Sequence, residues 1–116
     1  MNKEELQHHL NLILDNINST WKTVEHMSYN DFLRDETAKE MIYSYLQEMG
    51  QAAFHIRNDG DHLLDTEFNL DTLAAFRNAR FNQEAEMDHH PVWHFVKNEM
   101  REIGDQIEAS PSYLQM

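Results

Sequence analysis

The sequence predicts an all-α fold, an antiparallel bundle of four long helices plus a short helical turn. Apolar residues recur at three- and four-residue spacing in four separate segments, which is the periodicity of amphipathic helices. The 116 residues include three glycines and two prolines, too few for the many turns of a β-rich domain. A chain of this length fits one core, so we expect residues 1–116 to form a single domain.

The first long helix is expected from about residue 3 to 26. Its apolar face consists of Leu6, Leu10, Ile13, Leu14, Ile17, Trp21 and Val24. A short helical turn carrying Phe32 and Leu33 should follow. Ser28 begins a capping-box pattern there, because Asp31 stands at the third helical position.

The second long helix is expected to start near Asp35 or Glu36. Its apolar face consists of Met41, Ile42, Tyr45, Leu46, Met49, Ala52, Ala53 and Ile56. Gly50 falls inside this helix, where glycine costs about 1 kcal/mol relative to alanine. A close helix crossing at Gly50 would justify that cost.

The second half of the chain begins with a predicted long loop over residues 58–69. Asp71 is the expected cap of the third helix, and Pro91 suits the first turn of the fourth. Ser110 and Pro111 should end the fourth helix. The apolar faces are Leu73, Ala74, Phe76 and Phe81 in the third helix and Val92, Phe95, Val96, Met100, Ile103 and Ile107 in the fourth.

The composition is strongly acidic, with 21 Asp and Glu against nine Lys and Arg and a net charge of −12. Nucleic-acid binders usually carry a basic surface, so any RNA contact would depend on a local basic spot at Arg77 and Arg80. The absence of cysteine excludes a disulfide scaffold and a thiolate nucleophile. With no long apolar run and no secretory leader, we expect a cytoplasmic protein that does not enter membranes.

Four short features occur in a characteristic order along the chain. They are Ser28–Leu33, Met49–Ala53, the pair Arg77-Asn78, and the pair Val92-Trp93. In this order and spacing they resemble HepT-like proteins, the ribonuclease-toxin branch of the HEPN superfamily. The resemblance implies a homodimer, metal-independent RNA cleavage, and a small nucleotidyltransferase partner that attaches AMP to a motif tyrosine.

The catalytic motif of that family reads Arg, four to six residues, His, any residue, Tyr. With Arg77 and Asn78 in place and a gap of four, the His position holds Asn82 and the Tyr position holds Glu84. The resemblance therefore implies a vestigial site that kept its arginine and lost its catalytic histidine. Arg77 can still bind phosphate, but we favour a structural pairing with a carboxylate such as Glu84 or Glu86.

A second string, Arg57 followed after four residues by His62, also fits the Arg-to-His spacing. It falls in the predicted loop, and Leu64 stands where the Tyr would be. So short a pattern often matches by chance, and we interpret it as coincidence.

Three histidines near the last helix raise two further hypotheses. His90 and His94 have the spacing of two metal ligands on one helical face, but Pro91 puts His90 at or before the helix start. Alternatively, His89, His90 or His94 substitutes for the missing motif histidine. We expect no metal, and no phosphate loop or nucleotide-binding signature implies a cofactor.

The leading functional hypothesis is a HepT-like component of a HEPN/nucleotidyltransferase toxin–antitoxin-type module with a degenerate ribonuclease site, acting by binding. Whether the protein is an enzyme turns on Asn82 and Glu84, since RNA is a partner only if the site is active. One alternative is an active metal-independent ribonuclease toxin that uses Arg77 with a substitute such as His89. Another is an acidic helical adaptor that binds a basic protein.

Overall fold

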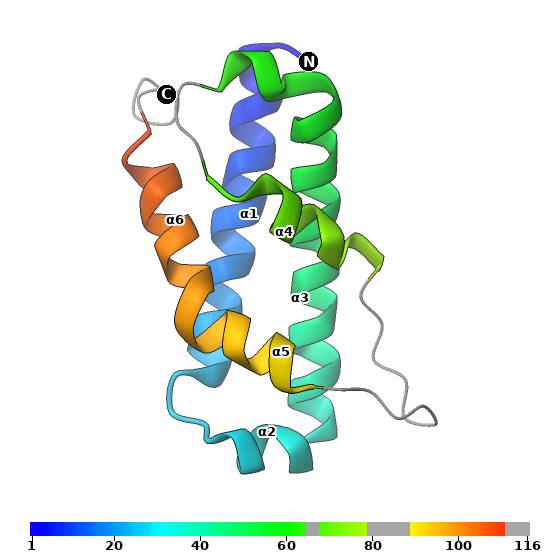
Figure 1. The fold of residues 1–116 in the computed structure, drawn as a ribbon, viewed down its shortest axis with the longest axis vertical. Helices are drawn as coiled ribbons and strands as arrows, with labels where there is room; N and C mark the ends of the chain where they lie inside the picture. The colour runs from blue at the N-terminus through cyan, green and yellow to red at the C-terminus, as the bar shows by residue number, and fades with distance from the viewer. Residues whose placement is uncertain (65–67, 79–88, 111–116) are drawn as a thin grey trace.

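Two long antiparallel helices form the frame of the molecule (Figure 1). The computed structural model describes residues 1–64, 68–78 and 89–110, and the regular elements in these ranges are all helical. The frame consists of α1 (Lys3–Val24) and α3 (Glu36–His55), and the short α2 (Tyr29–Arg34) joins them at one end. The predicted all-α class is confirmed.

The second half of the chain covers one side of this frame (Figure 1). Helix α4 (Leu70–Ala75), prolonged by a 3₁₀ turn (Phe76–Asn78), crosses α3 obliquely. Helix α5 (His90–His94) leads through a π-helical turn (Phe95–Glu99) into α6 (Met100–Glu108), which packs on α1 in the opposite direction. None of the helices in the described ranges combines the length and apolarity needed to span a membrane.

Side-chain caps fix the starts of the first three helices. The Asn2 side chain accepts a hydrogen bond of 2.8 Å from the backbone N–H of Glu5 at the start of α1. Ser28 and Asp31 form both halves of the capping box at α2, with lengths of 3.1 and 3.0 Å. Asp35 caps α3 through a 2.9 Å bond from the N–H of Ala38. These satisfy N–H groups that the helix leaves unpaired, and the predicted starts of α2 and α3 are confirmed.

One apolar core lies between α1, α3 and the second half of the chain. Most of the predicted apolar positions are buried in it, including Ile13 and Leu46. The predicted apolar face of α3 was wrong at two positions. Met41 is 42% exposed, and Tyr45 is only half-buried. Tyr43 is buried instead, because the buried stripe of α3 runs on the neighbouring side of the helix.

The predicted loop over residues 58–69 was also wrong in its first half. The helical path of α3 continues through a π-helical turn (Ile56–Gly60) and a 3₁₀ turn (Asp61–Leu63). Ile56 and Gly60 are both buried, and Gly60 lies against the sulfur of Met1. Packing therefore keeps this segment helical despite its turn-like composition.

The cap of α4 differs from the prediction by two residues. Asn69 occupies the capping position, and its side chain accepts a 3.1 Å hydrogen bond from the N–H of Thr72. Asp71 lies in the first turn of α4, where its charge complements the helix dipole. Phe81, predicted for the apolar face of the third helix, lies outside the described residues.

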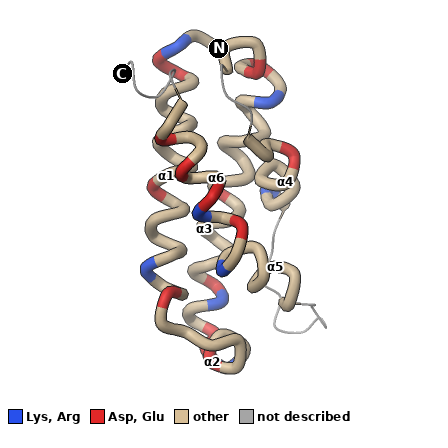
Figure 2. The backbone as a smooth tube through the Cα atoms, turned by 60° about the vertical axis from the view of Figure 1, so that its left-hand side comes forward, with Lys and Arg blue, Asp and Glu red and all other residues tan. Residues whose placement is uncertain are grey.

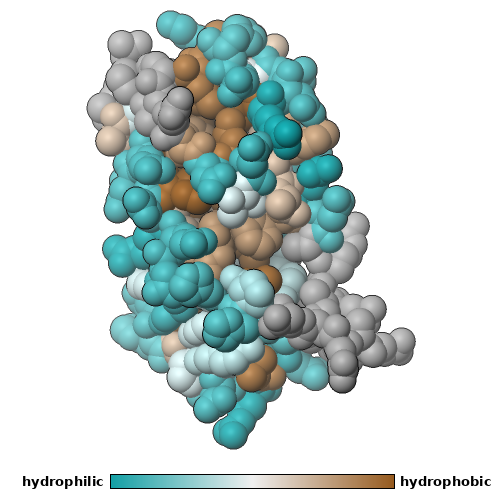
Figure 3. Space-filling model, in the orientation of Figure 1, coloured by the Kyte–Doolittle hydropathy of each residue, from teal (hydrophilic) through white to brown (hydrophobic). Residues whose placement is uncertain are grey.

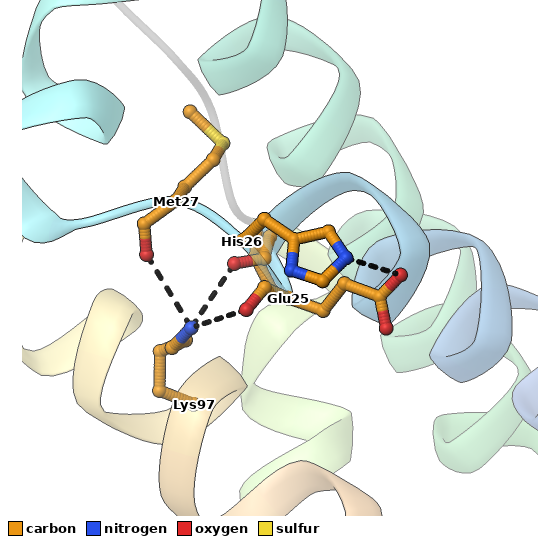
Figure 4. A network of polar contacts seen from close by, with 5 residues as sticks. Glu25, His26, Met27 and Lys97 are labelled. Atoms are coloured by element: carbon orange, nitrogen blue, oxygen red, sulfur yellow. Dashed lines mark hydrogen bonds and ion pairs between the residues drawn. The ribbon is translucent and has the colours of Figure 1, made fainter.

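The last helix is tied to the end of α1 by one lysine (Figure 4). Lys97 donates from Nζ to the carbonyl oxygens of Val24 at 3.0 Å and of Glu25 and Met27 at 3.4 Å. Carbonyls at the end of a helix have no partner within it, and a cation there also complements the dipole. Lys97 thus caps a helix more than 70 residues earlier in the chain.

Candidate functional site

The backbone of Arg77 is pressed against α3 at Gly50. A Cβ atom built on Gly50 would overlap the backbone nitrogen of Arg77 and lie 2.7 Å from the carbonyl carbon of Phe76. It would also lie 2.8 Å from the carbonyl oxygen of Leu73. Real Cβ atoms essentially never approach other atoms so closely, so this crossing requires glycine. The predicted close crossing at Gly50 is confirmed.

The Arg77 side chain lies over an aromatic ring of α3. Its guanidinium carbon is 4.4 Å from the centroid of the Phe54 ring, and Nη1 donates to the carbonyl oxygen of Ala74 at 3.1 Å. Within the described part of the chain, the half-buried cation makes a cation–π contact and one hydrogen bond, and a guanidinium has five N–H donors. Such a cation can still meet an anion.

Phe54 is a component of this site that sequence reasoning missed. It follows Gly50 by four residues, so both lie on one face of α3. An aromatic residue one turn beyond a crossing glycine was the signal that would have found it.

The rest of the motif is only partly visible. Asn78, next to Arg77, is exposed. Asn82 and Glu84, which were predicted at the His and Tyr positions of the motif, lie outside the described residues. The expected ion pair of Arg77 with Glu84 or Glu86 therefore stays a prediction.

His89 is anchored at the other end of α3. Its Nδ1 lies 2.8 Å from the hydroxyl oxygen of Tyr43, a residue that is only 3% exposed. The His89 ring also packs edge-on against Phe32, with ring centroids 6.0 Å apart. These contacts build the histidine into the end of the bundle where α2 meets α3.

The spacing along α3 separates His89 from Arg77. Their contacts on this helix, Tyr43 and Phe54, are eleven positions apart, which corresponds to about 16 Å at the rise of an α-helix. In Figure 1 the end of the α4 segment and the start of α5 lie at different levels along α3. A proton carrier must come within hydrogen-bonding distance of the reacting atoms, so the structure does not bring His89 to Arg77 within one protomer.

The other two histidines of the last helix have local partners. His90 packs edge-on against Tyr29, with centroids 5.4 Å apart. His94 Nε2 lies 3.9 Å from a carboxylate oxygen of Glu99, and its Nδ1 is 3.3 Å from Asn98 Nδ2. Among the described residues, no group of three or more potential ligands is arranged to hold a metal ion.

The second Arg-to-His string has a different environment from the one predicted. Arg57 lies on the helical continuation of α3 and forms an ion pair of 3.2 Å with Asp71, the exposed first-turn residue of α4. His62 is exposed on the following 3₁₀ turn. This pairing ties α3 to α4 and gives the string no catalytic geometry.

A histidine stack beside Phe54 was not predicted from the sequence. The rings of His9 and His55 stack with centroids 5.4 Å apart, and His8 is 5.6 Å from His9. Nδ1 of His9 is buried with no hydrogen-bond partner among the described residues. Burial lowers the pKa of His9, the neighbouring His55 and His8 lower it further, and the carboxylate of Glu5 opposes the shift.

One family model matches most of the chain. The model, described as ribonuclease HepT-like, matches residues 13–110. This range contains the capping box of α2, the Gly50 crossing, Arg77 and the whole last helix. No curated protein and no solved structure gives a significant match.

Proposed function

Because the chain belongs to the HepT-like ribonuclease family, we propose that it is the HepT-like component of a toxin–antitoxin-type module whose ribonuclease site is degenerate, and that it acts by binding. The observation that carries this proposal is the pair Asn82 and Glu84, which occupy the His and Tyr positions of the family's motif. We place the protein in the cytoplasm, where its antitoxin partner would be found.

The chemistry of RNA cleavage supports the loss of activity. Attack by a ribose 2′-hydroxyl without a metal requires a base, an acid for the leaving oxygen, and a cation for the charge on phosphorus. Arg77 supplies the cation, but Asn82 cannot exchange protons near neutral pH. Glu84 adds negative charge near a phosphate, on a chain whose net charge is already −12.

The runner-up, an active ribonuclease that uses His89, has geometry against it. His89 is engaged with Tyr43, about two to three helical turns of α3 from the Arg77 contacts.

The test is an RNA-cleavage assay on the metal-free protein. We expect the wild type to leave single-stranded RNA intact, because loss of general acid–base catalysis typically lowers a rate by about 10²–10⁴. The double change Asn82→His, Glu84→Tyr should recover some cleavage, and a further Arg77→Ala should abolish it. The double change Asn18→His, Asn98→Tyr, which adds the same residue types at exposed positions outside the motif, serves as the control and should stay inactive.

One pattern of cleavage would refute the degenerate-site proposal. If the wild type cuts RNA, and His89→Ala stops it while Asn82→Ala does not, then the degenerate-site proposal is wrong and the active-toxin alternative holds.

The partners of this function are a second copy of the chain and a nucleotidyltransferase antitoxin. The third and fourth predicted helices, α4 and α5–α6, should form a two-fold interface that brings both copies of Arg77 near its axis. Glu84 would remove the acceptor of AMP, so the antitoxin should bind without modifying this protein. We expect light scattering to give twice the chain mass at tens of micromolar, and a monomer there would refute the dimer.

A further inference from the structure

A groove with an apolar floor and an acidic rim lies between α4 and the last helix. Its volume is about 490 Å³. Phe68 and the small exposed parts of Phe95 and Ile103 form its apolar portion, and Asn69, Thr72 and Gln106 add polar groups. Glu99 and Glu102 stand on the side formed by the last helix. Figure 3 shows this region as apolar surface between α6 and α4, bordered by hydrophilic residues.

The carboxylates of the rim and the cations of the same helix point to different places. Glu99 and Glu102 are three residues apart, so they share one side of the helix. Lys97 is turned onto the end of α1, where its Nζ meets the carbonyl oxygens. The guanidinium of Arg101 lies over the ring of Trp21, 4.6 Å from its centroid.

Because Lys97 and Arg101 contact α1 and not the groove, the rim of the groove is negatively charged. Figure 2 marks acidic positions along α6, and Glu102 is exposed. Glu99 has one partner among the described residues, His94 at 3.9 Å, which is charged only when protonated. No ion pair of Glu102 is found in the described part of the chain.

We propose that this groove binds a basic segment of a partner protein by taking up one arginine or lysine side chain. The methylene groups of such a side chain would cover Phe68, Phe95 and Ile103. Its charged end would lie between Glu99 and Glu102, where a guanidinium can bind carboxylates in a bidentate manner. This inference rests on the proposed binding role and names the chemistry of the partner.

Charge also favours a basic partner over a second copy of the chain in this groove. A two-fold contact centred on the groove would place the same acidic rim opposite itself, and like charges brought together across an interface oppose association. A partner of opposite charge is attracted instead, and the net charge of −12 extends that attraction beyond the groove. The two-fold axis proposed above lies near Arg77, and we expect that interface to leave the groove open.

The experiment uses a labelled ten-residue peptide in which arginine alternates with leucine, titrated against the full chain by fluorescence anisotropy. The same peptide with citrulline in place of arginine tests for charge and should bind far more weakly. The double change Glu99→Gln, Glu102→Gln should weaken binding about five- to tenfold, as expected for two partly exposed charge pairs.

A matched variant separates the groove from the overall charge. The change Asp105→Asn, Glu108→Gln removes the same charge from exposed positions of the same helix that do not line the groove. It should weaken binding by about twofold at most, because salt screens exposed charges at a distance. Thr72→Arg, which places a cation of the chain itself at the groove, should also compete with the peptide.

Three results would overturn the proposal. Equal losses in the two charge variants would mean that the peptide follows net charge alone. If Thr72→Arg dissociates a dimer but leaves peptide binding unchanged, a second copy occupies the groove. Backbone amide NMR shifts that avoid Phe95 and Ile103 on peptide addition would place the peptide elsewhere. The RNA-cleavage assay is independent of all three, so failure of the degenerate-site proposal would be seen separately.

Discussion

The replacement Gly50→Ala tests the crossing on which the position of Arg77 depends. Alanine gains about 1 kcal/mol of helix propensity over glycine. Against this, the new Cβ meets three backbone atoms, including the nitrogen of Arg77. Overpacking typically costs about 1–3 kcal/mol and occasionally more, and backbone atoms cannot rotate away as a flexible side chain can. We therefore expect a net loss of about 2 kcal/mol, at the upper end of that range after the propensity gain.

The assay is urea denaturation followed by circular dichroism, with a melting temperature as the second readout. A loss of this size should lower the melting temperature by about 10 °C for a domain of this length. Gly104→Ala in α6 is the matched control. Its Cβ would lie 3.5 Å from atoms of Ile17 and 3.8 Å from Leu14, which is ordinary contact, so it should stabilise by up to about 1 kcal/mol. If Gly50→Ala stabilises as much as Gly104→Ala, the argument for a close crossing is refuted.

Two further predictions concern charged groups away from this crossing. Lys97→Met should destabilise the protein by about 1–3 kcal/mol, because it leaves the part-buried carbonyl oxygens of Val24 and Met27 without their charged donor. Lys22→Met at an exposed position of α1 should change the urea midpoint little, and an equal loss in both would contradict the capping role. Burial lowers the pKa of His9 below 6.5 in the folded protein, so the unfolded chain binds more protons there and stability should fall as pH falls below 6.5. His9→Gln should flatten this acid slope and exposed His62→Gln should not, in urea titrations between pH 7 and 5; equal slopes in all three proteins would refute it.

The features that local sequence rules describe were predicted well. The capping box at Ser28 and Asp31 depends on residues three positions apart, and both hydrogen bonds are present. The cost of a glycine inside a helix pointed to the crossing at Gly50, which the structure confirms. The capping box is predictable because its two residues lie within one helical turn. The crossing is predictable because a glycine inside a helix lowers stability unless close packing compensates.

The predictions that were wrong or missing concern contacts between residues distant in sequence. The segment from Asn58 to Gly60 looked like the start of a loop, but the burial of Ile56 and Gly60 keeps it helical. The pairing of His89 with Tyr43 joins residues 46 positions apart, and Lys97 caps a helix 73 positions earlier. No periodicity or motif encodes such distances, so the anchor of His89 was not predictable from the sequence.

Arg77 has two structural roles that do not require catalysis. Its backbone fills the space that Gly50 leaves open, and its guanidinium covers Phe54 while bonding to Ala74. The arginine therefore contributes to packing whether or not a histidine follows it. Position 82, where the family resemblance expects the proton-carrying histidine, holds an asparagine. An arginine in the motif is thus weak support for activity in this chain, whereas the residue types at positions 82 and 84 bear directly on it. For this reason the paired replacement at those two positions, with Arg77 unchanged, tests whether Arg77 is still placed for cleavage. If the variant regains cleavage, the packing of Arg77 still presents its guanidinium to a phosphate. If the variant is folded but inactive, that packing no longer does so.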